Sequence, residues 1–360
     1  MLQVRAIDDD TEINAQITYS ITGGNVKSYF SIDSQTGWIN STTSIDFEQE
    51  QRFDLTVSAS DSKYTSYARV AIEVLNENDN NPKFNRSRFY VSVAENSPVL
   101  TSVTTILASD VDSFGQLSYS IESVQPTNQS DAFSVDLTSG MITTADDLDR
   151  ELIDRYVLQV KVVDSGEPEL SDFAIVIVDI TDKNDNPPEF SVSTLQAILP
   201  EDAGVGSHVA KIFATDADFG INANISYSIN SGTDMSTFVI STETGSITTN
   251  KKLDRENISN YVLICQARDH GQPQLSSMPI MIHVSLTDVN DNAPVFQQSA
   301  YAVNISEDSS TGSVVEEVLA VDSDVGLNGK VVYGISGGNE GGAFIIGNRT
   351  GENLCSSFHE

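Results

Sequence analysis

Apolar residues alternate with other residues along three similar segments of this chain. The segments read FDLTVSASD from Phe53, YVLQVKVVD from Tyr156 and YVLICQARD from Tyr261. Their first, third and fifth positions are large or apolar, and the positions between them are largely polar in the first two segments. Period-two alternation with aromatic and β-branched residues predicts strands that bury one face. By this alignment Cys265 is predicted to be a buried free thiol.

No segment of useful length has the apolar spacing of an amphipathic helix. Short predicted strands are separated by turns rich in Gly, Asn, Asp and Pro, and the pattern recurs about every 105 residues. This organisation predicts an all-β chain of tandem Greek-key β-sandwiches of immunoglobulin-like size. The Cys pair and intervening Trp of true immunoglobulin domains are absent from the sequence.

Short acidic motifs recur along the chain with the same spacing as the predicted strands. The phrases NENDNNPKF, DKNDNPPEF and DVNDNAPVF place Asp79, Asp185 and Asp291 at intervals of 106 residues. Paired aspartates, Asp-x-Glu pairs, single aspartates and single glutamates repeat with nearly the same step. They are Asp8/Asp10, Asp110/Asp112, Asp216/Asp218 and Asp322/Asp324; Asp46/Glu48, Asp149/Glu151 and Asp254/Glu256; Asp61, Asp164 and Asp269; and Glu95, Glu201 and Glu307.

The charge balance of the whole chain excludes several classes of partner. The 360 residues include 52 acidic and 19 basic side chains, for a net charge of −33, while 39% apolar content is enough for folded cores. This acidity argues against nucleic acid, which is bound through Lys and Arg, and against anionic membrane surfaces. The sequence shows neither a membrane-spanning apolar stretch nor a signal peptide at its start, so we expect a piece of a longer protein.

The clustered acids are best explained by a bound cation. Residues i and i+2 of an extended segment point to the same side, so if the acidic pairs lie in extended segments, each pair sends two carboxylates to one place. Several carboxylates with amide and carbonyl oxygens form the shell of six to eight oxygens that Ca²⁺ takes, whereas Mg²⁺ keeps more of its waters. Transition metals favour His or Cys, and none of the four His residues recurs in register.

Neither an EF-hand nor a glycosidase site fits the spacing of the acids. An EF-hand loop needs Glu at its twelfth position, but counting from Asp8, Asp216 and Asp322 gives Tyr19, Tyr227 and Tyr333, which we expect to end the loop in a core strand. A glycosidase would need one acidic pair in one cleft, not equivalent acids in every repeat. The sequence therefore does not predict an enzyme or a small-molecule substrate.

Taken together, the phrases AEN/PED, LDRE, DxNDNxPxF, DxD and DxG resemble the extracellular cadherin repeat along essentially the whole chain. The motifs DSGEP and DHGQP are more similar to those of protocadherin and Fat/Dachsous-type members than to those of classical cadherins. The resemblance implies four repeats: residues 1–81 (truncated at its N-terminal side), 82–187, 188–293 and 294–360 (truncated at its C-terminal side, with an off-pattern tail at 352–360).

The resemblance also implies that calcium ions lie at the junctions between repeats, three at each complete junction. The implied ligands at the first–second junction are Asp46, Glu48, Asn76, Asn78, Asp79, Asn80, Asp110, Asp112 and Asp164. Those at the second–third junction are Glu95, Asp149, Glu151, Asp182, Lys183, Asn184, Asp185, Asn186, Asp216, Asp218, Asn222 and Asp269. Those at the third–fourth junction are Glu201, Asp254, Glu256, Asp288, Val289, Asn290, Asp291, Asn292, Asp322, Asp324 and Asn328.

The implied function is calcium-dependent cell–cell adhesion, in which Ca²⁺ stiffens the junctions and the partner is a like or related cadherin ectodomain. The chain would then be a glycoprotein on the extracellular side of the plasma membrane, attached to the membrane only through other parts of its parent protein. A spacer or mechanical segment, or a heterophilic receptor–ligand ectodomain without its own adhesive interface, remains the alternative. Sequons at Asn40, Asn85, Asn128, Asn224, Asn257, Asn304 and Asn348 agree with an extracellular location.

Overall fold

A computed structural model describes residues 2–9, 16–61, 63–112 and 115–356 of the chain. Asp10, the second member of the first aspartate pair, and residues 357–360 of the off-pattern tail lie outside the described residues. The chain divides into two compact units, Met1–Thr181 and Asp182–Glu360.

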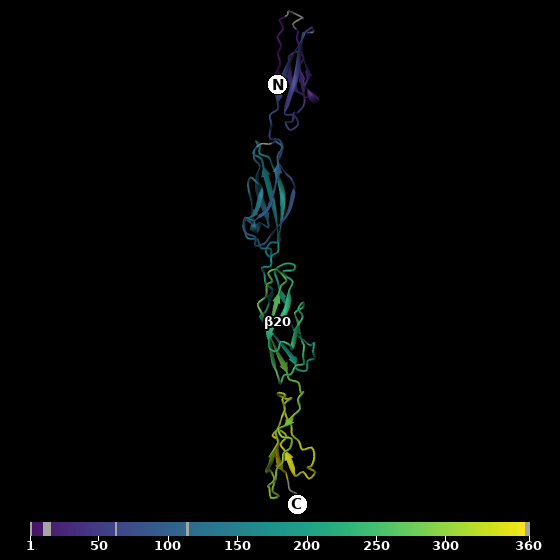
Figure 1. Cartoon of the computed structure of the whole chain (residues 1–360), viewed down its shortest axis with the longest axis vertical. Helices are drawn as coiled ribbons and strands as arrows, with labels where there is room; N and C mark the ends of the chain where they lie inside the picture. Colours follow the sequence, from purple (N-terminus) through teal and green to yellow (C-terminus); the bar gives the residue numbers. More distant parts are fainter. Residues whose placement is uncertain (1, 10–15, 62, 113–114, 357–360) are drawn as a thin grey trace. The chain divides into compact units, whose positions relative to one another are not determined.

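The first unit contains two repeats built from short strands. Their bounds are β1 Leu2–Gln3, β2 Thr18–Gly23, β3 Phe30–Ile32, β4 Trp38–Ser41, β5 Arg52–Ser60, β6 Thr65–Glu73, β7 Lys83–Phe84, β8 Arg88–Ala94, β9 Ser102–Thr105, β10 Ala108–Ser109, β11 Ser118–Gln125, β12 Phe133–Val135, β13 Met141–Thr144, β14 Arg155–Val163 and β15 Ser171–Thr181. The described residues of the unit also include two single 3₁₀ turns, η2 Val26–Ser28 and η3 Thr127–Gln129. Figure 1 draws the strands as arrows, coloured along the sequence.

The described residues of the second unit form strands and no helix, and no α-helix occurs in either unit among the described residues. Its strands are β16 Glu189–Phe190, β17 Thr194–Pro200, β18 His208–Lys211, β19 Ala214–Thr215, β20 Ser226–Gly232, β21 Phe238–Ile240, β22 Ser246–Thr249, β23 Asn260–Arg268, β24 Ile280–Thr287, β25 Val295–Phe296, β26 Val314–Glu317, β27 Ala320–Val321, β28 Phe344–Ile346 and β29 Glu352–Cys355. The all-β prediction is confirmed.

Two sheets face each other across an apolar core in both the second and the third repeat. The second repeat has a four-stranded sheet of order β11-β14-β15-β8 and a three-stranded sheet of order β12-β13-β9, and the third has β17-β24-β23-β20 and β18-β22-β21. The three segments with alternating residues form β5, β14 and β23, and their first, third and fifth predicted core positions are buried in each repeat. Burying one face of a strand fixes its register, which is why this prediction succeeds.

One edge of each four-stranded sheet is made by a parallel strand. β8 pairs in parallel with β15, and β17 pairs in parallel with β24. These edge strands end directly before Glu95 and Glu201, whose N–H groups donate to the carbonyls of Thr181 and Thr287. The pairing therefore brings an early acidic residue of each repeat next to the segment that follows the last strand.

The fourth repeat differs from the others within its described residues. A three-stranded sheet of order β26-β29-β28 is present, but residues 330–336 form no strand, and Tyr333 is only half-buried. Tyr19 and Tyr227 are buried as expected, whereas the prediction that Tyr333 lies in a core strand is wrong. Among the described residues of the fourth repeat, Cys355 is the single buried apolar side chain. Without a facing sheet, Tyr333 has no core to enter.

Cys265 is expected to react slowly with thiol reagents in the folded chain. Its side chain is fully buried on β23 in the core of the third repeat, and burial raises the pKa of the thiol to about 11. Because the thiolate is the reactive form, both its access and its ionisation are suppressed. Peptide-resolved mass spectrometry after brief alkylation should show little label at Cys265 and rapid labelling after unfolding. A Met281→Cys variant, on the outward side of β24, provides the exposed control, and equal labelling rates would contradict the assigned register.

Candidate metal centre

The predicted metal ligands follow the ends of strands. The paired aspartates come after β10, β19 and β27, the Asp-x-Glu pairs precede β14 and β23, and the DxNDN segments follow β6, β15 and β24. Antiparallel and parallel pairing gather these strand ends at the boundaries between repeats.

The paired aspartates lie in turns and not in extended strands. The N–H of Asp218 donates to Oδ1 of Asp216 at 3.0 Å, and Asp112 and Asp324 repeat the same contact with Asp110 and Asp322. The premise that the paired aspartates lie in extended segments is therefore wrong. The first aspartate holds the turn, and the second, which is buried in all three cases, lies among other acids.

A buried glutamate organises the Asp-x-Glu loops of the second and third repeats. The N–H of Arg150 donates to Oε2 of Glu95 at 2.8 Å, and the N–H of Arg255 donates to Oε2 of Glu201 at the same distance. Glu95 and Glu201 are only 1% and 3% exposed. These contacts fix the backbone at the arginine of the LDRE motif. The sequence analysis did not name this arginine as a site residue, although it recurs in both LDRE motifs.

The asparagine in the middle of the linker is inserted into the loop after β14 or β23. Nδ2 of Asn184 donates to Oδ2 of Asp269 at 3.1 Å and to the carbonyl of Pro273 at 2.6 Å. A Cβ at Gly271 would lie only 2.2 Å from the Asn184 amide carbon, so glycine is required for this close approach. Asn78 makes the same contacts with Asp164 and Pro168 beside Gly166.

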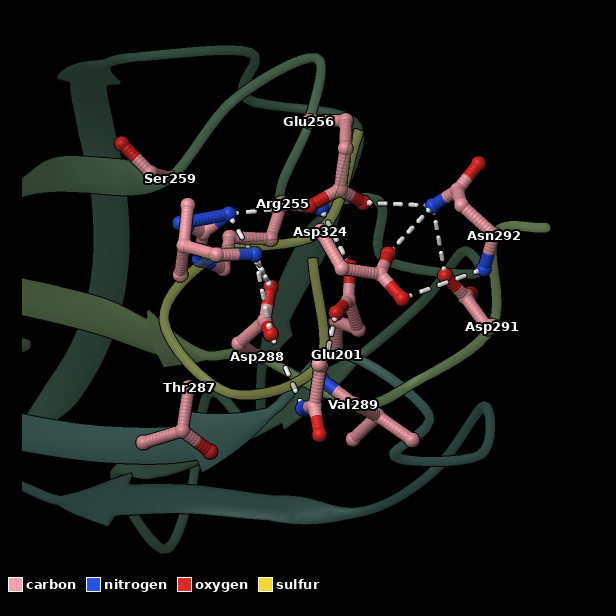
Figure 2. A network of polar contacts seen from close by, with 12 residues as sticks. Glu201, Arg255, Glu256, Ser259, Thr287, Asp288, Val289, Asp291, Asn292 and Asp324 are labelled. Atoms are coloured by element: carbon pink, nitrogen blue, oxygen red, sulfur yellow. Dashed lines mark hydrogen bonds and ion pairs between the residues drawn. The ribbon is translucent and has the colours of Figure 1, made fainter. Parts of the chain in front are cut away.

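Within the second unit, the third–fourth junction forms two overlapping clusters of carboxylates. Oxygens of Glu201, Glu256 and Asp291 lie within 4.8 Å of one another, as do oxygens of Glu256, Asp288 and Asp324. Figure 2 shows Glu256, Asp291 and Asp324 around the amide of Asn292. Glu256 belongs to both clusters, so it could contact two cations at once.

Hydrogen bonds fix the other groups of this junction. Nδ2 of Asn292 donates to Asp291 and Asp324 at 2.8 Å each, and Nδ2 of Asn328 donates to Asp288 at 2.9 Å. Arg255 forms ion pairs with Glu256 at 2.9 Å and Asp288 at 3.2 Å (Figure 2).

Three more predicted ligands of this junction have distinct environments. The N–H of Val289 donates to Glu201 at 2.8 Å, and Asp254 accepts the N–H of Asn257 at 2.9 Å. Asn290 is exposed, unlike Asn78 and Asn184. Residues 294–360 contain no counterpart of the Asp164 and Asp269 loops that enclose those two asparagines.

The first–second junction lies within the first unit and forms one cluster. Oxygens of Glu48, Asp79 and Asp112 lie within 4.8 Å of one another. The N–H of Asn80 donates to Asp112 at 2.7 Å, and Nδ2 of Asn76 donates to the Asp112 carbonyl. Asp46 lies outside this cluster and accepts the N–H groups of Glu48 and Gln49 in its own turn.

The ligands predicted for the second–third junction are divided between the two units. In the first unit, oxygens of Glu95, Asp149 and Glu151 lie within 4.8 Å of one another. In the second unit, Asp182 accepts the N–H of Phe219 at 3.0 Å and Nδ2 of Asn222 at 2.7 Å. There, too, Asn186 donates to Asp218 and to Asp185, each at 2.8 Å. Lys183 is exposed in the same segment.

Buried oxygens without a hydrogen-bond partner test whether a cation fits these loops. Five such side-chain atoms occur among the described residues, and all five belong to predicted ligands: Oδ1 of Asn76, Asn78 and Asn184, and Oδ2 of Asp110 and Asp216. Leaving a buried acceptor unsatisfied is costly. Oxygen atoms from carboxylates and amides are the donor set that Ca²⁺ prefers, so the residues present fit the ion.

Some carboxyl groups of the metal centre have pKa values above those of isolated groups. Loss of solvent, followed by the charges of neighbouring acids, raises the pKa of Asp291, and burial is likewise the main cause of the raised pKa values of Asp216 and Asp218. The pKa of Glu151 is raised from 4.5 to about 7 by burial and by the charge of Glu95, against the opposing effect of Arg150. Divalent cations would remove this repulsion.

In chelator, the free energy of unfolding should fall as the pH rises from about 4.5 to above 7. A carboxyl whose pKa is raised in the folded chain stabilises that chain only while protonated. This contribution from Glu151 is complete below pH 4.5 and is lost as the pH passes through about 7. Urea titrations at pH 5 and pH 8 in EDTA would measure the difference. Glu151→Gln should reduce it, and an equal slope in this variant would show that other groups are responsible.

Comparison with known proteins agrees with this arrangement. The family described as "Cadherin domain" matches residues 1–75, 89–181, 195–286 and 301–356. The chain belongs to the cadherin family. Cadherins are adhesion and receptor proteins and not enzymes. This confirms the prediction from the sequence that the chain is not an enzyme.

Similar cadherins are much longer than this chain. It is 38% identical over 355 residues to "Protocadherin-like wing polarity protein stan" of Drosophila melanogaster, covering 96% of the chain and 10% of that protein. It is 39% identical over 345 residues to "Protocadherin Fat 4" of Mus musculus, covering 94% of the chain and 7% of that protein. These matches confirm the similarity to protocadherin-like and Fat-type members.

Solved cadherin structures share the fold of the whole chain. The Protocadherin GammaB4 extracellular domain matches with a TM-score of 0.78 and 29% identity, covering 100% of this chain and 58% of that one. The "Protocadherin gammaB7 EC3-6 cis-dimer structure" matches with a TM-score of 0.79 and 29% identity, covering 100% and 87%. The relatives are cell-surface cadherins with extracellular repeats, and in the described part of this chain no helix is long and apolar enough to cross a bilayer.

Proposed function

We propose that this chain is part of an extracellular adhesion ectodomain whose four repeats, 1–81, 82–187, 188–293 and 294–360, are joined by calcium ions. The observation that carries the proposal is the gathering of carboxylates around linker amides, with buried oxygens that no hydrogen bond satisfies. The similarity to protocadherin-like and Fat-type proteins supports the adhesive role.

The ions would be held by residues from both sides of each junction. Glu256, Asp288, Asp291 and Asp324 are the acids that would hold them at the third–fourth junction, and Glu48, Asp79 and Asp112 are their counterparts at the first–second junction. When bound, Ca²⁺ supplies positive charge and coordination to oxygens of two repeats. The residues themselves orient the carboxylates through the Asn292 and Asn80 contacts, and they bury Asp112 and Asp324 away from water.

The partner is proposed to be another cadherin ectodomain, like or related, and the site of action the outer side of the plasma membrane. Beads coated with the chain should aggregate in about 1 mM Ca²⁺, within the weak affinity range of extracellular calcium modules, and disperse in EDTA. Beads that carry a heat-denatured chain provide the control. Dispersed beads in calcium, despite calcium binding in solution, would favour the spacer alternative.

A further inference from the structure

The third–fourth junction contains a positive charge that the chain itself supplies. The guanidinium of Arg255 forms ion pairs with Glu256 at 2.9 Å and with Asp288 at 3.2 Å, and Figure 2 shows dashed lines from Arg255 to both acids. The side chains of Arg255, Glu256 and Asp288 are only 15%, 19% and 11% exposed, so solvent and salt screen these contacts incompletely. Glu256 and Asp288 also form one carboxylate cluster with Asp324. The arginine therefore contacts acids that are predicted to hold calcium.

Asp288 extends this contact into the fourth repeat. Besides the ion pair with Arg255, its carboxylate accepts the N–H of Val325 at 3.1 Å and Nδ2 of Asn328 at 2.9 Å. On the other side, the backbone N–H of Arg255 donates to Glu201, which fixes the arginine in the third repeat. A series of polar contacts between protein groups therefore runs from the third repeat through Arg255 and Asp288 to the fourth.

The guanidinium keeps its charge in this setting. The hydrogen bond to Glu256 raises the pKa of Arg255, loss of solvent opposes the rise, and the charges of Asp288, Glu256 and Glu201 add to it. A planar guanidinium has several N–H donors and can contact two carboxylates at once. A cation between two acids reduces their mutual repulsion, which is the effect that a calcium ion would also have.

The arginine and the first acid of the linker occur together in the repeats. Both LDRE motifs are followed by linkers that begin with an aspartate, Asp182 and Asp288. The first repeat has neither charge, because Phe47 occupies the arginine position in IDFE and the linker begins with Asn76. Nδ2 of Asn76 instead donates to the carbonyl of Asp112. The joint absence of the two charges is expected if the arginine and the linker acid act as a pair.

We propose that Arg255 is a resident cation of the third–fourth junction, which ties the linker to both repeats without calcium and weakens calcium binding there. The inference rests on the proposed function, because it concerns the same carboxylates. An ion held by Glu256 and Asp288 would share their oxygens with the guanidinium and be repelled by its charge. The arginine therefore makes the junction less dependent on calcium.

Hydrogen-exchange mass spectrometry of the whole chain across a calcium titration tests each junction separately. Peptides covering residues 286–292 and 322–328 report on the third–fourth junction, and those covering 76–80 report on the first–second junction. In EDTA, Arg255→Met should speed exchange at 286–292 and 322–328, because Asp288 loses its partner in the third repeat. The calcium concentration that gives half-maximal protection there should fall roughly threefold, because a repelling charge is removed. Exchange at 76–80 should stay unchanged.

Two variants control for charge. Arg255→Lys keeps the positive charge and should leave the calcium midpoint close to that of the wild type. Arg349→Met removes the same charge from the exposed turn between β28 and β29 and should change neither the exchange in EDTA nor the midpoint. Equal effects of Arg349→Met and Arg255→Met would show that only the net charge matters, which would overturn the inference.

The pair can also be introduced at the first–second junction. In EDTA, Phe47→Arg should slow exchange at residues 76–80 more strongly in combination with Asn76→Asp than alone, because only the combination places an acid beside the arginine. This test does not depend on the stability of Arg255→Met. An equal effect of Phe47→Arg with and without Asn76→Asp would contradict pairing between the two positions.

The direction of the calcium midpoint decides between two roles of Arg255. A higher midpoint in Arg255→Met would show that the arginine orients the ligands for the ion and would overturn the inference, as would unchanged exchange in EDTA. The melting temperature of each variant in calcium verifies that it is folded. If calcium protects no junction of the wild type, the proposed function itself fails, whatever Arg255→Met does in EDTA.

Discussion

Removing calcium with EDTA should lower the melting temperature of this chain by roughly 5 °C or more relative to about 1 mM Ca²⁺. Extracellular calcium modules bind with dissociation constants of about 10⁻⁴ to 10⁻³ M, so each ion would contribute about 0.4–1.4 kcal/mol at that concentration. The third–fourth junction alone has two clusters of carboxylates that could each hold an ion. In chelator, the same acids would repel one another, with the ion pairs of Arg255 as partial compensation.

Scanning calorimetry measures this effect directly. Mg²⁺ at the same concentration should stabilise the chain much less, since it keeps its waters and demands a stricter geometry. The Mg²⁺ arm therefore separates specific coordination from general screening of a −33 chain. A melting temperature that is the same in EDTA and in Ca²⁺ would show that the clustered acids do not hold the ion.

The strands and the acidic loops could be predicted because each leaves a local pattern in the sequence. Phe53, Tyr156 and Tyr261 are the first buried residues of strands in which every second side chain is buried, and this alternation is visible in the sequence. The parallel pairing of β8 with β15 leaves no such mark, because it joins residues far apart in the chain. Tyr333 shares the local pattern of Tyr227, but the facing sheet needed to bury it is not formed by the described residues.

Within the metal centre, residue types were easier to predict than their contacts. Gly166 and Gly271 belong to the recurring phrases DSGEP and DHGQP, but only the structure shows that Asn78 and Asn184 occupy the space a side chain would fill. The apolar side chains on the outward side of the four-stranded sheet in the second repeat, among them Tyr90 and Phe173, were also not predicted. They come from β8, β14 and β15, and β15 is apolar on both faces, so alternation does not distinguish its outward side.

Asp291→Asn is expected to have opposite effects on stability with and without calcium. Asp291 lies within 4.8 Å of Glu201 and Glu256, and its pKa is raised by loss of solvent and by the charges of Asp324 and Glu256. In EDTA, the amide removes one repelling charge, so the melting temperature should stay the same or rise. In calcium, the variant should melt lower than the wild type, because fewer anionic ligands lower calcium affinity.

The measurement is calorimetry of wild type and variant across a calcium titration, and the two curves of melting temperature should cross. Glu243→Gln is the control for charge, since Glu243 is exposed on the turn between β21 and β22 and belongs to none of the carboxylate clusters among the described residues. Glu243→Gln should change the melting temperature equally in EDTA and in calcium. If Asp291→Asn instead lowers the melting temperature equally in EDTA and in calcium, the carboxylate stabilises the fold through its contact with Asn292 and not through an ion.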